Sequence, residues 1–308
     1  MKTVYDVLGL GVTAVDDLLY VREYPPADTK LRVRARDRQG GGLTGTALIA
    51  AARLGASCAY AGMLGDDELS RFVVDTMHAE GVDTRHVLHR DDASPVHSTI
   101  VVDETHHTRT ILYHVANASG AEATHPAEEV VRSTKVLFVD QYGIDGMIRA
   151  AKIAREAGAG VVADFEHSGD HPRFGELLAL VDHLILPRDY ARELSGRDDV
   201  ADAVRKLFRG DLDTVCVTCG ADGAYYVAKD APTEVRHQPA FKVQTVDTTG
   251  CGDVFHGAYA FALSSGLAAD ERVQFASAVA ALKATQPGGQ KGIPPLSAVD
   301  AFLSERDQ

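Results

Sequence analysis

The sequence is poor in cysteine, and this limits the kinds of site it can build. Its 308 residues include four cysteines, at positions 58, 216, 219 and 251. They are too few and too scattered for a disulfide scaffold. Cys216 and Cys219 form a CxxC spacing, but no second pair or neighbouring histidine pair completes a zinc set. We therefore interpret them as a buried strand cysteine and a turn cysteine.

Basic charge and long apolar runs are also scarce. Lysine and arginine together number 31 against 44 aspartate and glutamate, a net charge of −13, and no dense basic run offsets it. Nucleic acid is therefore not an expected partner. An acidic protein can still bind ATP, because backbone dipoles and magnesium act locally. No apolar run approaches the length of a membrane span and the first residues lack a secretory pattern, so we expect a cytoplasmic protein without a membrane partner.

The pattern of apolar residues predicts an α/β fold, in one large domain or two smaller ones. After Pro126, strands near residues 136–140, 160–164, 183–186 and 214–218 alternate with helices, which is typical of a mostly parallel sheet covered on both faces. Between His97 and His114 the period becomes two, which predicts a hairpin. Lys30 to Arg38 alternates apolar and basic residues, as a strand with one wet face would. Together with the strands near residues 20 and 35, the hairpin indicates a second, smaller sheet.

Early in the chain, Gly9 to Ala14 matches the GxGxxA dinucleotide fingerprint. The helix that this fingerprint requires does not follow, because the next residues read as extended up to Pro25 and Pro26. We interpret the match as a look-alike. Asp16 follows the first strand, where it is either a ligand contact of an open α/β sheet or a solvated turn residue.

The most informative stretch runs from Val246 to Ala258. We expect a strand over residues 240–246, then a turn with Gly250 and Gly252, then a helix. The first N–H groups of a helix have no internal partner and carry partial positive charge, so phosphate can bind where glycine leaves room. Asp253 beside such a site is suited to take a proton from an attacking hydroxyl. The alternative is that it only caps the helix.

Three ordered motifs carry a family resemblance. Asp247 to Asp253 is similar to the DTxGAGD signature of the ribokinase-like carbohydrate kinases, also called the phosphofructokinase-B family. The stretch from Gly41-Gly42 to Gly55 resembles the N-terminal glycine signature of that family, and Val217 to Gly223 resembles its VTxGxxG motif. The resemblance covers essentially the whole chain.

The resemblance implies a fold and an activity. The fold is a three-layer α/β/α sandwich in one domain over residues 1–308, with a small β-sheet lid whose strands lie within about 18–38 and 97–114, often paired across a homodimer. The activity is ATP-dependent transfer of a phosphoryl group to a hydroxymethyl group of a sugar. Magnesium would neutralise charge on the phosphate oxygens.

Matching positions imply roles for individual residues. Asp253 would be the base, and the anion hole would consist of Gly250, Cys251 and Gly252. The sugar site would include Asp16, Gly41 and Gly42, with Thr46 where the family often has asparagine. ATP would contact Thr218, Gly220, Gly223 and Thr248. A monovalent cation such as K⁺ would lie beside Asp247 and Thr249. Asp164 and Glu166 would be acidic groups around magnesium, or plain surface residues. The loop from Gln286 to Pro294 would form a wall for adenine.

The substrate is less clearly indicated. The chain is most similar to 6-deoxy-6-sulfofructose kinases through Arg236 to Val243 and Pro287-Gly288-Gly289, and to ketohexokinases in lacking an NxxE element near residues 187–191. Lys30 matches a cationic position, and Arg109 either contacts an anionic substrate or is solvated. Tyr113 and Tyr142 stand where asparagine and arginine would bind a sulfonate. A neutral ketose such as fructose is therefore expected, and the alternatives are a sulfofructose kinase, a nucleoside kinase or a non-catalytic nucleotide sensor.

Overall fold

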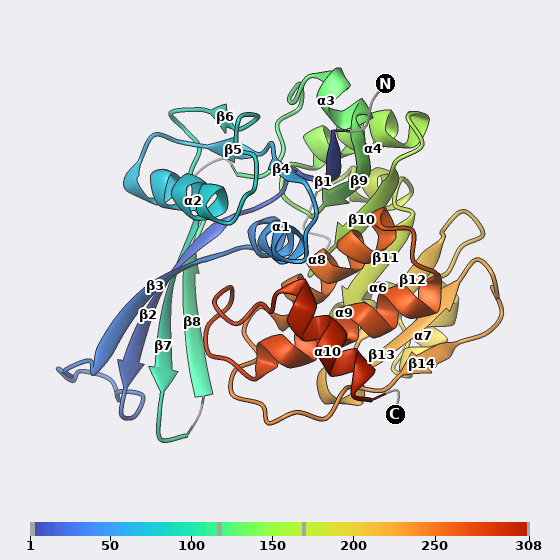
Figure 1. Cartoon of the computed structure of the whole chain (residues 1–308). Coiled ribbons are helices and arrows are strands. Elements are labelled where there is room, and N and C mark those ends of the chain that lie inside the picture. The colour runs from blue at the N-terminus through green and yellow to red at the C-terminus, as the bar shows by residue number, and fades with distance from the viewer. Residues whose placement is uncertain (1–3, 107, 116–118, 168–170, 307–308) are drawn as a thin grey trace.

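A twisted sheet of eight strands forms the centre of the molecule. The structure is a computed structural model that describes residues 4–106, 108–115, 119–167 and 171–306 (Figure 1). Six neighbouring strands of the sheet are parallel, and two antiparallel strands extend one edge. In spatial order the strands are β14 (Arg236–Gln238), β13 (Ala224–Ala228), β12 (Thr214–Thr218), β11 (His183–Pro187), β10 (Gly160–Asp164), β9 (Thr134–Val139), β1 (Tyr5–Gly9) and β4 (Cys58–Tyr60).

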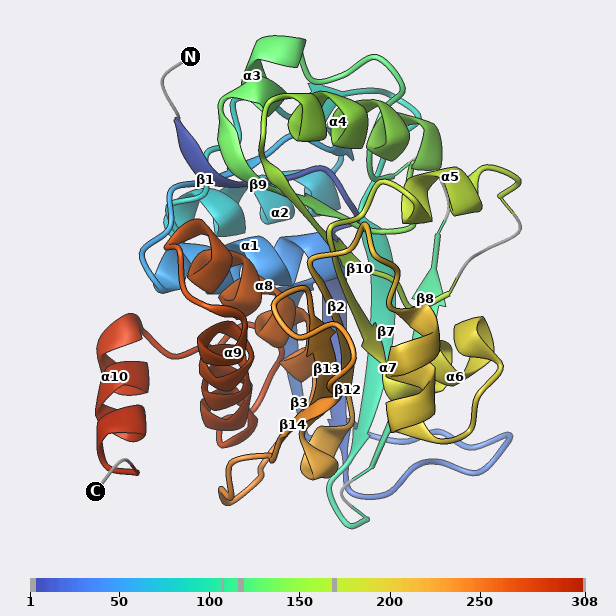
Figure 2. The ribbon, with the colours of Figure 1, turned by 90° about the vertical axis from the view of Figure 1, so that its right-hand side faces the viewer.

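Helices cover both faces of this sheet because its strands are apolar on both sides. In β9, Val136 and Phe138 belong to one buried cluster, whereas Leu137 and Val139 belong to the other. One cluster packs against α3 (Glu128–Arg132), α4 (Ile144–Glu156), α5 (Phe174–Leu178), α6 (Arg188–Ser195) and α7 (Val200–Leu207). The other packs against α1 (Leu43–Arg53), α2 (Glu68–Ala79), α8 (Cys251–Ser264), α9 (Ala269–Ala284) and α10 (Leu296–Ser304). Figure 2 shows the two helix layers on opposite sides of the sheet, so the predicted three-layer fold is confirmed.

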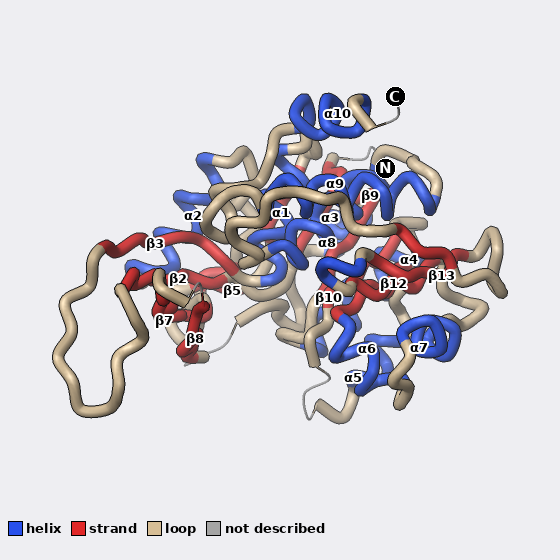
Figure 3. The backbone as a smooth tube through the Cα atoms, turned by 90° about the horizontal axis from the view of Figure 1, so that it is seen from below, coloured by secondary structure: helices blue, strands red, loops and turns tan. Residues whose placement is uncertain are grey.

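A second sheet projects from one end of the sandwich (Figures 1 and 3). We call this four-stranded sheet the lid. Its spatial order is β3 (Ala35–Gly41), β2 (Ala14–Val21), β7 (Val96–Asp103) and β8 (Thr108–His114). The predicted hairpin is present, since β7 and β8 pair antiparallel from His97 with His114 onwards. A short parallel pair, β5 (Met63–Leu64) and β6 (Leu88–His89), lies near α2 and β4 (Figure 1).

Two strand predictions were wrong. The strand expected from Lys30 begins only at Ala35, because the preceding loop contains Pro25, Pro26 and an Asp28 with a φ of 60°. Residues 240–246 are not a strand either. Pro239, directly after β14, has no N–H to continue the ladder, and the segment crosses instead to α9, where Val246 N donates to Ala284 O over 2.8 Å.

In the part of the chain that the structure describes, every helix is too short or too polar to cross a bilayer.

Candidate active site

The glycine turn and the start of α8 form an anion loop, which we define as residues 248–252. Gly250 has a left-handed φ of 72° and directly precedes the helix. The first bond within the helix runs from Val254 N to Gly250 O over 2.9 Å. The N–H groups of Gly252 and Asp253 come before that bond and are available to a ligand. A Cβ atom at Gly252 would meet nothing within 4 Å, so this position leaves open space for an anion.

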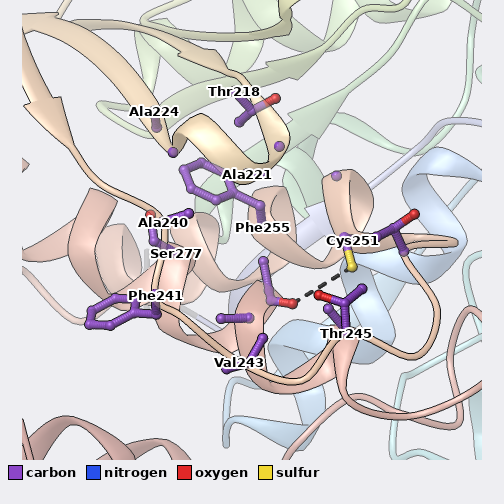
Figure 4. A pocket seen from close by; sticks show the side chains of 17 residues that line it. Thr218, Ala221, Ala224, Ala240, Phe241, Val243, Thr245, Cys251, Phe255 and Ser277 are labelled. Carbon is purple, nitrogen blue, oxygen red and sulfur yellow. Dashed lines mark hydrogen bonds between the residues drawn. The ribbon is translucent and has the colours of Figure 1, made fainter.

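A cavity of about 480 Å³ lies directly beside the anion loop. Figure 4 shows its wall, which includes Cys251, Phe255 and Thr218. All residues expected to contact ATP line it, namely Thr218, Gly220, Gly223 and Thr248, together with Cys251 and Gly252 of the predicted anion hole. The cavity is large enough for a nucleotide base and ribose, and its walls are mainly apolar, as suits a flat aromatic ring.

Part of this wall was not predicted. Sequence reasoning missed the extended segment that supplies Ala240, Phe241, Val243 and Thr245, and one face of α9 with Ser277, Ala280, Ala281 and Ala284. The small residues of α9 recur at helical spacing, and this signal could have found them. The loop from Gln286 to Pro294 is not among the residues that line this cavity, and its role as a wall for adenine stays a prediction. It packs against the lid and the anion loop, since Gly289 N donates to Gln39 Oε1 over 3.0 Å.

The turn after β12 shows why two glycines occur in the cavity wall. Gly220 begins a single 3₁₀ turn, and Gly223 ends it with a φ of 88°. A Cβ atom at Gly223 would lie 2.0 Å from Gln238 O, so only glycine fits there. Cys216 and Cys219 are buried in this region with free thiols, which agrees with their interpretation as structural residues.

On the lid side, Asp16 and the glycines after β3 come together. A Cβ atom at Gly41 would lie only 2.5 Å from Asp16 Oδ2, so the carboxylate fills the space that a side chain would need. Gly42 has a φ of 84° and begins α1. Burial and the charge of Asp17 raise the pKa of Asp16, whereas a hydrogen bond from Ser98 lowers it. This half-buried carboxylate is therefore placed to accept hydrogen bonds from hydroxyl groups.

Two other residues predicted to bind the sugar, Thr46 and Lys30, differ in their surroundings. Thr46 is buried in α1, and its Oγ1 accepts a hydrogen bond from Gln290 Nε2 over 3.2 Å. Lys30 is exposed in the long loop that joins β2 to β3, which Figure 3 shows reaching far from the main sheet. The structure does not bring Lys30 to the other acceptor residues of the same chain.

The strand β8 carries two of the residues predicted to bind the substrate, Arg109 and Tyr113. Burial, together with the charges of Asp140 and Glu166 and the phenol of Tyr113, raises the pKa of Tyr142 to about 12, so Tyr113 lies within electrostatic range of Tyr142. Tyr113 itself is 68% exposed. Arg109 is also exposed. Burial raises the pKa of the Cys251 thiol, and the positive charge of Arg109 lowers it. Arg109 therefore lies within electrostatic range of the anion loop.

Asp253 stands among other carboxylates. It is the third residue of α8, whose N-cap is Gly250, and within the described helix no side chain makes a cap hydrogen bond. Helix capping is thus not the role that the structure gives it. Burial, together with the charges of Asp164, Glu166 and Asp16, raises the pKa of Asp253 well above its usual range, and Lys283 opposes the rise.

Asp164 and Glu166 follow β10 and differ in accessibility. Asp164 is 2% exposed, and its Oδ2 lies 3.2 Å from His256 Nδ1. Burial raises the pKa of Asp164 strongly. Glu166 is exposed, and its oxygens suit Mg²⁺. Among the described residues no cluster of three or more metal-binding side chains is present.

Sequence reasoning missed two buried residues that hold the site together. Asp140, at the end of β9, accepts hydrogen bonds from Val12 N (2.7 Å), Thr44 Oγ1 (2.9 Å) and Tyr142 N (2.8 Å), and burial raises its pKa to about 6. His256 bonds to Gly252 O over 2.8 Å through Nδ1 and to Ile185 O over 3.2 Å through Nε2. Asp140 ends a predicted strand, as Asp164 does, so the rule that singled out Asp164 could have found it.

Asp247 supports the anion loop from behind. Its Oδ1 accepts from Thr249 N and its Oδ2 from Gly288 N, each over 2.8 Å. Burial would raise the pKa of Asp247, but these hydrogen bonds hold it below the usual range. The ammonium of Lys283 donates to the backbone oxygen of Asp247 over 2.9 Å.

Comparison with known proteins gives one consistent result. The family model described as pfkB family carbohydrate kinase matches residues 9–296. A ribokinase of Haemophilus influenzae is 30% identical over 280 residues, covering 85% of this chain and 87% of that protein. Fructokinase-1 of Oryza sativa subsp. japonica is 31% identical over 280 residues, covering 82% and 85%. The structure of Arabidopsis thaliana ribokinase complexed with ribose and ATP superposes with a TM-score of 0.83 at 21% identity, covering 98% and 99%.

Proposed function

Because the chain belongs to the pfkB family of carbohydrate kinases, we propose that it transfers the γ-phosphoryl group of ATP to a primary hydroxyl group of a neutral ketose such as fructose. The observation that carries this proposal is the position of Asp253. Its carboxylate lies in the first turn of α8, directly after Gly252, which lines the nucleotide-sized cavity, and within electrostatic range of Asp16 in the lid.

In the proposed reaction, the acceptor hydroxyl gives its proton to Asp253 as its oxygen attacks the γ-phosphorus. The bond from that phosphorus to the bridging oxygen breaks, and the electron pair leaves with ADP. The raised pKa of Asp253 makes it a better proton acceptor than an ordinary aspartate. The free N–H groups of the anion loop would stabilise charge on the transferring group. Magnesium bound with ATP supplies further charge neutralisation, and Glu166 is the exposed carboxylate that fits it.

The charge of the acceptor side favours a neutral substrate. Asp16, Asp164 and Glu166 all act on the pKa of Asp253, so negative charge accumulates where the sugar would lie. An anionic group such as a sulfonate would be repelled there. Tyr142 and Tyr113, which lie within electrostatic range of each other, offer phenol groups to hydroxyls and no positive charge. The cations Arg109 and Lys283 lie on the side of the anion loop.

We also propose that the protein forms a homodimer through the lid. The edge strand β8 exposes Ile111, Leu112 and Tyr113, with exposed fractions of 47%, 56% and 68%. An exposed apolar edge strand is suited to pairing with a second chain. Sedimentation equilibrium should give twice the chain mass, and Leu112→Lys should shift the equilibrium to monomers. A parent protein that sediments as a monomer would overturn this proposal.

The proposed activity can be tested by measuring ADP release with ketoses, aldoses, sulfofructose and nucleosides. We expect the highest kcat/KM with a ketose and much lower values with sulfofructose. Calorimetric titration with ATP, without an acceptor, is the control: it shows that the protein binds ATP even when an acceptor is not phosphorylated. Preference for a nucleoside or for sulfofructose would replace the ketose assignment. Tight ATP binding without turnover on any acceptor would instead support a nucleotide sensor.

The clustered carboxylates predict an unusual pH dependence. Asp253 must be ionised to accept a proton, and its pKa is raised, so kcat/KM should fall on acidification at a pH well above the ordinary aspartate value of 3.8. Asp164→Asn removes the neighbouring charge that raises the pKa of Asp253 most, and it should move this midpoint to lower pH by about one unit. Asp211→Asn is the control, because Asp211 is exposed and forms an ion pair with Arg209 at 3.2 Å. An unmoved midpoint in the Asp164 variant would show that the acid limb belongs to another group.

A further inference from the structure

A lysine is completely buried behind the anion loop. Lys283 lies in the last turn of α9, and its exposed fraction is 0%. Full burial is rare for lysine, because an ammonium group must then be compensated by nearby oxygens or negative charge. Here the Nζ donates to Asp247 O over 2.9 Å, which fixes the ammonium against the residue that precedes the anion loop.

Burial lowers the pKa of Lys283, but nearby acidic groups favour its charged form. Cys251, Asp247 and Asp253 raise this pKa, and Arg109 lowers it further. Conversely, Lys283 opposes the rise in the pKa of both Cys251 and Asp253. The ammonium therefore lies within electrostatic range of the anion loop and of the carboxylate that faces the acceptor.

Several of the oxygens that a monovalent cation could use at this position already accept hydrogen bonds. Both carboxylate oxygens of Asp247 accept backbone N–H groups, and its main-chain oxygen accepts from Lys283. Ala284 O, the nearest carbonyl of the α9 terminus, accepts from Val246 N (2.8 Å) and Asp247 N (3.1 Å). K⁺ requires several free oxygens in place of its hydration shell. The ammonium of Lys283 on Asp247 O therefore competes with the monovalent cation that the resemblance implied beside Asp247 and Thr249.

We propose that the ammonium of Lys283 takes the place of a monovalent cation behind the anion loop, so that this kinase needs no K⁺. The proposal deepens the proposed kinase function and rests on it for its effect on turnover. Lys283 acts as a positioning residue. It holds Asp247 and the loop that follows, and it adds fixed positive charge near the transferring phosphoryl group without any ion having to bind.

The first test uses the parent protein and exchanges the cation. At equal ionic strength, kcat should agree within about twofold in K⁺, Na⁺ and tetramethylammonium salts, because the charge is part of the chain. The melting temperature should also not depend on which of these cations is present. Activation by K⁺ of more than about tenfold would overturn the proposal, since a factor of ten already requires a binding ion that stabilises the transition state.

The second test removes the ammonium. Lys283→Met keeps an unbranched side chain that is one atom shorter, and it should lower kcat by about 10²-fold, as for a lost electrostatic contact to the transition state. Lys283→Ala leaves space, so K⁺ or NH₄⁺ should raise both its kcat and its melting temperature relative to tetramethylammonium. Lys229→Met, at an exposed lysine paired with Asp213, is the control. Full activity of Lys283→Met, or no cation effect on a folded Lys283→Ala, would contradict the proposal.

The melting-temperature measurements need no acceptor. They separate a failure of this proposal from a failure of the ketose assignment, because a cation effect confined to Lys283→Ala supports the built-in cation even when no acceptor is turned over.

Discussion

Asp253→Asn is expected to lower kcat by about 10²–10⁴-fold, the usual contribution of a positioned general base. Asparagine has nearly the same shape as aspartate but cannot accept the hydroxyl proton. Removal of a negative charge beside the anion loop should leave ATP affinity unchanged or slightly improved. Initial rates with a saturating ketose measure the first effect, and calorimetric titration with ATP measures the second.

A matched control exists in another helix. Asp145 lies in the first turn of α4, on the opposite face of the sheet, and forms an ion pair with Arg173 at 2.5 Å. Asp145→Asn should leave kcat close to that of the parent. Turnover of Asp253→Asn within a few-fold of the parent would assign proton removal to a different group. Equal losses in both variants would point to damage of the fold.

Gly41→Ala is expected to have the next largest effect, on the acceptor alone. The added Cβ atom would lie 2.5 Å from Asp16 Oδ2, so the carboxylate must move. Displacement of a positioning group by about 1 Å can lower the rate by about 10²-fold. We therefore expect kcat/KM for the ketose to fall by about 10²-fold, while the KM for ATP stays the same because the nucleotide cavity does not include Gly41.

Gly175→Ala controls for the substitution itself, since Gly175 lies in the short helix α5 and a Cβ atom there meets nothing within 4 Å. It should leave both kinetic constants unchanged. A rise in the KM for ATP in Gly41→Ala, as large as the loss for the ketose, would show that the change spreads beyond Asp16.

Some features could be predicted because their causes are local. The anion loop needs only a left-handed glycine, an unblocked glycine and the start of a helix, and all of these lie between Gly250 and Asp253. The three-layer fold follows from strands that are apolar on both faces and alternate with helices, as in β9. The lid hairpin follows from its period of two. Where the local rule was incomplete, as for the segment after Pro239, the strand prediction was wrong.

The amino-acid sequence by itself determined the sandwich, the anion loop and the acidic residue beside it, because these depend on periodicity and on residues close along the chain. Only the tertiary structure decided what holds them together. Asp140 accepts hydrogen bonds from Val12, which is 128 residues away along the chain, from Thr44, which is 96 residues away, and from its near neighbour Tyr142. Lys283 looks like an ordinary basic residue in the last turn of a helix, a place that the helix dipole favours. Its burial behind the anion loop depends on the packing of α9 against α8, and long-range packing of this kind leaves no periodic signal in a single sequence.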